Sequence, residues 1–154
     1  MVSRIVLVGI APGPSHRGPH VALHPGKPGS AGARLASIMG LTPEEYLRKF
    51  DRTNVLCEPV GKWGIVGESR VARNAATCML PLLAGRDVVF LGADVARAFG
   101  RKDLTFHSWE ATAYEGLEKA VYAALVPHPS GRNRWYNDPA NFAEAREFWK
   151  ETLR

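Results

Sequence analysis

The sequence predicts an α/β protein: a three-layer α/β/α sandwich on a central four-stranded parallel sheet. Two observations predict this class. Short apolar runs alternate along the chain with segments of helical periodicity, which is typical of a parallel sheet covered by helices. The runs are continuous rather than alternating with polar residues, as expected for strands buried on both faces. At 154 residues the chain is expected to fold as one domain, residues 1–154.

Four segments are the predicted strands. Each is short, apolar and rich in β-branched or aromatic residues, and each precedes a turn. They are residues 4–9, 53–57, 88–92 and 121–126.

Five segments are the predicted helices, covering residues 31–39, a helix opening at Thr42-Pro43, residues 68–84, residues 93–99, and a last helix from Asp138-Pro139 to Leu153. Gly40 is placed as a C-cap of the first helix. Thr42 as N-cap, with Pro43 at the first helical position, is a helix-start signal. Residues 100–119 show no clear periodicity.

Charge and composition limit the function classes. The net charge of +5 suits anionic partners, including nucleic acid, without specifying one. No apolar run approaches the ~20 residues that a membrane-spanning helix needs. The apolar run at residues 5–8 is too short for a signal peptide. We therefore expect a cytoplasmic monomer without membrane contact. Cys57 and Cys78 lack metal or disulfide spacing and are expected to be half-buried packing residues.

The loop at residues 14–32 is rich in Pro, Gly and His. A loop of this length in a compact domain is usually functional or disordered. His16, His20 and His24 have the spacing of metal ligands on a helix, but the intervening prolines and glycines oppose a helix. We therefore expect no metal site. Neither dinucleotide-binding nor phosphate-loop glycine patterns are met, so no cofactor is expected.

Residues 126–137 form the most chemically distinctive stretch. Pro127 and Pro129 flank His128, and a loop stiffened by prolines suits a histidine that must meet a reacting atom. Arginine and aromatic residues follow, a combination that suits a polyanion with unstacked bases. The alternative is a solvated surface turn. Because loops after Gly9, around Asn54 and after residue 126 follow parallel strands, we expect them to converge on one cleft.

Five segments, in order, resemble motifs of the uracil-DNA glycosylase superfamily, particularly its iron–sulfur thermophilic branch and cluster-free relatives. Gly-Ile-Ala-Pro-Gly at residues 9–13 is similar to the first motif, and His-Pro-Ser at 128–130 to the second catalytic motif. Between them lie a glycine-rich helix start at 29–35, a base-reading strand at 53–55, and a Leu-Gly-Ala strand end at 91–93.

The resemblance implies an enzyme that flips a nucleotide out of DNA and cleaves its N-glycosidic bond. His128 would donate a hydrogen bond to the departing base, and Asn54 would read the base edge. By the same resemblance, catalytic positions are His128, Ile10 and Ala11; substrate contacts are Gly9, Pro12, Gly13, His20, His24, Asn54 and Ser130; DNA contacts are Lys27, Gly131, Arg132, Asn133, Arg134, Trp135 and Tyr136.

Departures from the family pattern leave alternatives open. Ile10 stands where the iron–sulfur branch has a water-activating glutamate, and Ala11 where the mismatch-specific branch has asparagine. The cluster cysteines are absent, so no iron–sulfur cluster is expected. Residues 14–30 hold no aromatic residue to stack on the base, so His20 or His24 would stack instead or the pocket would be wider. The alternatives are a non-catalytic nucleic-acid or nucleotide binder, and an enzyme for free nucleotides or a bulky, phage-type modified base.

Overall fold

The computed structural model describes residues 3–12, 22–57 and 69–154. Its centre is a five-stranded sheet in the order β2-β1-β3-β5-β4. The strands are β1 (Ile5–Gly9), β2 (Phe50–Asn54), β3 (Asp87–Leu91), β4 (Trp109–Thr112) and β5 (Val121–Val126). The first four in spatial order are parallel, and β4 pairs antiparallel with β5 at one edge.

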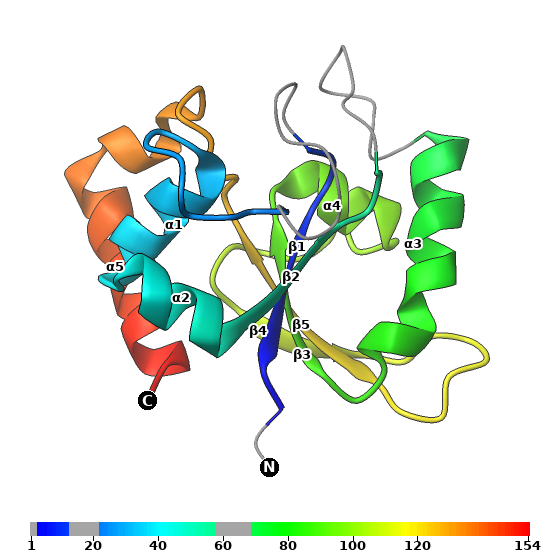
Figure 1. Ribbon diagram of the computed structural model, residues 1–154. Coiled ribbons are helices and arrows are strands. Elements are labelled where there is room, and N and C mark those ends of the chain that lie inside the picture. Colours follow the sequence, from blue (N-terminus) through cyan, green and yellow to red (C-terminus); the bar gives the residue numbers. More distant parts are fainter. Residues whose placement is uncertain (1–2, 13–21, 58–68) are drawn as a thin grey trace.

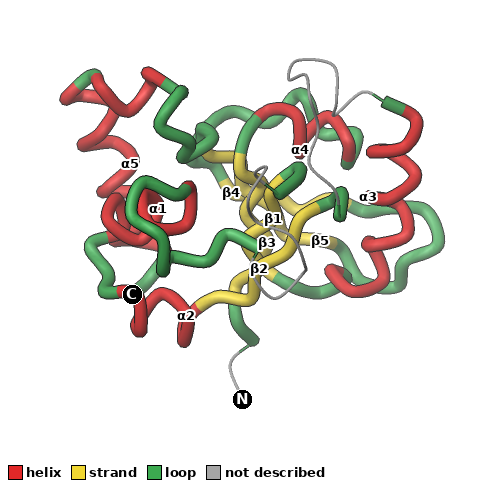
Figure 2. Tube along the Cα trace, turned by 45° about the horizontal axis from the view of Figure 1, so that its top comes forward, coloured by secondary structure: helices red, strands yellow, loops and turns green. Residues whose placement is uncertain are grey.

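Helices cover both faces of this sheet (Figures 1 and 2). On one face lie α1 (Ala31–Met39), α2 (Pro43–Lys49) and α5 (Pro139–Thr152), and on the other α3 (Arg70–Leu83) and α4 (Ala93–Ala98). Strand side chains alternate between the two layers. In β1, Val6 and Val8 enter the core under α3 and α4, whereas Leu7 enters the core under α1 and α5. Two apolar cores therefore hold the sheet from both sides.

Local sequence signals account for the helix ends. The hydroxyl of Thr42 accepts the Glu45 N–H at 3.2 Å, and the Glu45 carboxylate accepts the Thr42 N–H at 2.9 Å. This capping box starts α2, with Pro43 in the first turn. Gly40 ends α1 in the left-handed conformation, at φ 73°, and Asp138 caps α5. The predicted caps are confirmed.

The α/β class is confirmed, but the prediction of a purely parallel four-stranded sheet was wrong. The missed strand, β4, lies within residues 100–119. Its sequence, Trp-Glu-Ala-Thr, has only partly buried or exposed side chains. An edge strand that buries little apolar surface gives no continuous apolar run, and so it carried no signal.

The second strand was also placed too late. It runs from Phe50 to Asn54 rather than over residues 53–57, because its middle residues are polar. Val55 and Leu56, which gave the apolar signal, follow the strand and extend its pairing with the end of β1. The two cysteines, expected to be half-buried, are both exposed. Among the described residues no helix has the length and apolar character needed to span a membrane.

Candidate active site

His128 lies just beyond the carboxyl end of β5, half-buried. The backbone N–H of Ser130 donates a hydrogen bond to Nδ1 of the ring at 3.0 Å. Because Nδ1 accepts this bond, the proton of the neutral imidazole must be on Nε2. The loop therefore selects a tautomer that presents Nε2–H as a donor.

The loop around His128 is braced by hydrogen bonds from two residues further along the same stretch and from one residue of α1. The amide of Asn133 donates to the His128 carbonyl at 2.8 Å, and the Tyr136 hydroxyl donates to the Pro127 carbonyl at 2.6 Å. From α1, the guanidinium of Arg34 donates to the Ser130 carbonyl at 3.0 Å. The histidine is thus held by contacts on either side of it in the sequence, as a group positioned for chemistry would be.

Burial lowers the pKa of His128 below its usual range, and the negative charge of Asp94 offsets part of this effect. Asp94 lies in the first turn of α4 and forms an ion pair with Arg97, at 2.9 Å. At neutral pH the ring is therefore neutral, which the Ser130 bond also requires. The sequence did not single out Asp94. Its position two residues after Gly92, where β3 has ended, could have indicated a charged group near the carboxyl ends of the strands.

Gly92, the residue after β3, packs against this histidine. Its φ of 103° and ψ of 158° are in a region open essentially only to glycine. A Cβ at this position would lie 3.2 Å from Cβ of His128. The absence of a side chain at Gly92 therefore lets β3 and the His128 loop approach each other closely.

Asn54 and Gly9 are adjacent at the ends of β2 and β1, where they are paired in the sheet. The side-chain oxygen of Asn54 lies over Gly9, so close that a Cβ there would be 2.4 Å away. A glycine at position 9 therefore makes room for the amide of Asn54. Asn54 and His128 follow strands three positions apart in the sheet, which corresponds to about 14 Å between strand ends.

The turn after β1 carries Ile10 and Ala11, the two predicted catalytic positions besides His128. Ile10 is 2% exposed and packs in the core beneath α3 and α4, so its side chain cannot contact a substrate or a water molecule there. The carbonyls of Gly9 and Ile10 accept the N–H groups of Val55 and Leu56 at 2.8 Å. Ala11 is partly buried against the same core. At this predicted catalytic position the side chain belongs to the core, so only the backbone of Ile10 is left for a role in the site.

The loop before α1 is described from residue 22 onward. Nδ1 of His24 accepts the Gly26 N–H at 3.0 Å, and Ser30 donates to the His24 carbonyl at 3.3 Å. His24 is half-buried and Lys27 is exposed. These contacts give His24 a turn-forming role. Of the other substrate positions, Pro12 is buried, and Gly13 and His20 lie outside the described residues.

In the second half of the 126–137 stretch, some side chains pack against the rest of the protein and others are exposed. Tyr136 is 5% exposed and braces the loop, and Trp135 packs against the core under α1 and α5. Asn133 caps the 3₁₀ helix η3 (Arg134–Asn137) as well as bonding to His128. Arg132, Arg134 and Gly131 are exposed. Among the predicted DNA contacts in this stretch, these last three are thus exposed, Asn133 and Trp135 are half-buried, and Tyr136 is buried.

His128, Ser130, Gly92 and Asp94 thus form one group beyond the ends of β5 and β3. Asn54 and Gly9 form a second group at the ends of β2 and β1. Neither a scan against protein-family models nor a search of curated proteins finds a match for this chain. The function is therefore inferred from the geometry of these residues.

Proposed function

We propose that the protein is a DNA glycosylase that extrudes uracil or another modified base and hydrolyses its N-glycosidic bond. One observation carries the proposal: the Ser130 N–H on Nδ1 of His128 leaves a neutral ring with Nε2–H as donor. A neutral donor held at a fixed point suits a leaving group on which negative charge develops. The resemblance of five ordered sequence segments to uracil-DNA glycosylases supports the same reaction.

In this reaction the bond between the sugar C1′ and the base nitrogen breaks, and its electron pair leaves with the base. The sugar becomes an oxocarbenium-like cation, to which water adds with loss of a proton. The Nε2–H of His128 donates to the carbonyl oxygen of the base, where the negative charge collects. A preorganised donor of this type contributes about 3–4 kcal/mol to transition-state stabilisation.

Asn54 would recognise the base. Its amide offers one donor and one acceptor, the pair needed to read an edge that presents a carbonyl and an N–H. The exposed Arg132 and Arg134 follow His128 in the same stretch and would bind phosphates on either side of the extruded nucleotide. The roles divide into leaving-group stabilisation, base reading and backbone positioning.

A second candidate is a non-catalytic nucleic-acid binder with the same fold. The burial of Ile10 favours it, because neither this residue nor Ala11 offers a side chain that can orient a water molecule. The two candidate functions are distinguished by whether abasic sites are formed. A glycosylase leaves abasic sites, whereas a binder leaves the DNA intact and shows only salt-sensitive affinity.

The experiment incubates the protein with single- and double-stranded DNA carrying uracil, deaminated purines or hydroxymethylated bases, followed by alkaline cleavage of abasic sites. We expect excision by the wild-type protein and a loss of about 10²–10³-fold in single-turnover rate for His128→Ala. If no substrate is cut, or if His128→Ala cuts as fast as the wild type, the proposal fails.

A matched pair of variants tests whether Asn54 recognises the base. Asn54→Ala is expected to lose discrimination between uracil and cytosine, because the amide that reads the edge is gone. Asn74→Ala removes the same chemical group from an exposed position on α3, away from the sheet edge, and should leave the rate and discrimination unchanged. Equal effects of the two variants would contradict the role of Asn54.

A further inference from the structure

We propose that Arg97, Lys102 and Phe106, which we term the α4–β4 strip, bind single-stranded nucleic acid, with one base stacked on Phe106 and its phosphodiester beside the two cations. The strip lies outside every position singled out from the sequence. The proposal rests on the proposed function only for the choice of a nucleic acid as partner.

Phe106 is one of the few large apolar side chains that are exposed among the described residues. It is 42% exposed, although its ring touches Trp135 edge-to-face, with centroids 5.8 Å apart. Trp135 belongs to the loop that positions His128. Phe106 therefore lies beside that loop, and a nucleobase is a flat partner that would cover the exposed part of its ring.

A cavity lined by two basic residues, Arg97 and Lys102, lies next to the residue that pairs with Phe106. Arg97 is also ion-paired with Asp94. The volume of the cavity is about 290 Å³, near the lower end of the ~300–1,000 Å³ typical of ligand pockets, so it suits one small group such as a phosphodiester. Leu125 links cavity and ring, since it lines the cavity and forms a β-bridge with Phe106. The lining residues are Ala93, Ala96, Arg97, Lys102 and Leu125.

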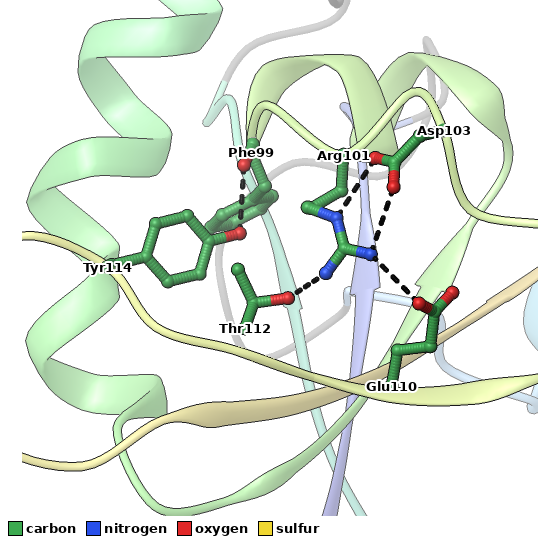
Figure 3. Close-up of polar contacts among 6 residues, drawn as sticks. All are labelled: Phe99, Arg101, Asp103, Glu110, Thr112 and Tyr114. Atoms are coloured by element: carbon green, nitrogen blue, oxygen red, sulfur yellow. Dashed lines mark hydrogen bonds and ion pairs between the residues drawn. The ribbon is translucent and has the colours of Figure 1, made fainter.

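The segment that carries Lys102 and Phe106 is held rigidly (Figure 3). The guanidinium of Arg101 donates to Asp103 at 3.0 and 3.2 Å, lies 3.6 Å from Glu110, and bonds to the hydroxyl of Thr112 on β4. These contacts clamp both ends of residues 101–112. A fixed ring loses little entropy on binding, which favours its use as a stacking surface.

The positively charged side chains near the Phe106 ring favour an anionic partner. Lys102 is exposed and makes no ion pair with any described residue, and the same holds for Arg132 and Arg134 across the His128 loop. Protein-binding surfaces are depleted in lysine, whereas grooves for single strands combine cations with exposed aromatic rings. A partner with negative charges and flat rings therefore fits the strip better than an apolar protein surface does.

The test measures the affinity of unmodified oligothymidine, about twelve nucleotides long, and of the same backbone with abasic tetrahydrofuran units in place of the nucleosides. The wild type should prefer the oligomer with bases. Phe106→Ala should bind oligothymidine about 5–100-fold more weakly and lose this preference, whereas Phe106→Trp should keep it. Lys102→Ala should weaken both oligomers equally and reduce the salt slope by about 0.7.

Tyr122→Ala is the matched control. Tyr122 is 44% exposed and aromatic but lies near the start of β5, stacked on Trp109, so its loss should leave both affinities unchanged. A base preference that survives Phe106→Ala, an equal loss in Tyr122→Ala, or no DNA binding at all would overturn the proposal. Excision with Phe106-independent binding would refute only the strip, and Phe106-dependent binding without excision would refute only the glycosylase.

Discussion

The strand ends at β1 and β5 lie at the same edge of the sheet, with β3 between them, but they present opposite chemistry. After β5 the chain presents His128, held by Ser130 and Asn133. After β1 it directs Ile10 into the core. One end holds an imidazole whose Nε2–H can donate a hydrogen bond, while the described residues of the other end, residues 10–12, carry no titratable side chain. Under the proposed function, such a site would act on the leaving group rather than on the nucleophile.

The largest expected effect comes from placing a carboxylate where the iron–sulfur branch carries one. Ile10→Glu would put an unpaired charge at a position that is 2% exposed. We expect the free energy of unfolding to fall by about 3 kcal/mol or more, as measured by urea denaturation, with no gain in excision. Ala11→Glu, at a partly buried position, should cost less than half as much. If Ile10→Glu were as stable as the wild type, the buried placement of this residue would be wrong.

The contrast between these two strand ends shows what could be read from the sequence. The α/β class, most helix ends and the position of His128 after the last parallel strand followed from apolar runs and capping residues. The burial of Ile10 did not, because a single apolar residue in a Gly-Pro turn is equally compatible with a core or a pocket position. Which face it occupies is decided by the continuation of β1–β2 pairing through Val55 and Leu56, a long-range contact.

The packing roles of Trp135 and Tyr136 were hidden for a similar reason. A DNA-contacting aromatic ring and a buried one give the same sequence pattern after a proline-rich turn. For Tyr136, the hydrogen bond to Pro127 distinguishes the two. Phe106 was missed because residues 100–119 lack periodicity. Local signals thus located strands and caps, while tertiary contacts assigned individual side chains to core, brace or surface.

A second prediction concerns Gly92, which separates β3 from the His128 loop. Gly92→Ala should cost about 1–3 kcal/mol of stability because of its backbone conformation. It should also lower the excision rate, since the new Cβ would lie 3.2 Å from His128. Gly100→Ala is the matched control: it has φ 70° but no atom within 4 Å of the added carbon. This control should lose stability without losing activity, and equal rates in both variants would refute the steric role of Gly92.

A third, smaller effect tests the brace behind His128. Tyr136→Phe removes the hydroxyl that donates to the Pro127 carbonyl at 2.6 Å and leaves that buried acceptor without this bond. We expect a loss of about 1 kcal/mol in the free energy of unfolding, measured by urea denaturation. Tyr122→Phe alters an exposed tyrosine and should have no effect. A neutral Tyr136→Phe would show that the hydroxyl does not stabilise the loop.

The smallest expected effect is the contribution of His128 to the pH dependence of the free energy of unfolding. Burial lowers the pKa of His128 in the folded protein below the unfolded value of about 6.5. The unfolded chain therefore binds more protons, so the stability that is complete above about pH 6.5 is lost as the pH falls through the folded pKa. Burial lowers the pKa of His107 as well, and the wild type will show both contributions.

His128→Gln isolates the contribution of the active-site ring, because it retains a polar group without a titration in this range. Its stability should fall less steeply with acid than that of the wild type, by a fraction of one bound proton, in urea denaturation between about pH 5 and 7. Protonation at Nδ1 would also break the bond from Ser130, so the excision rate should decline over the same acidic range. Parallel pH profiles for the two proteins would mean that His128 is not buried neutral, and that the end of β5 is as solvated as an ordinary surface turn.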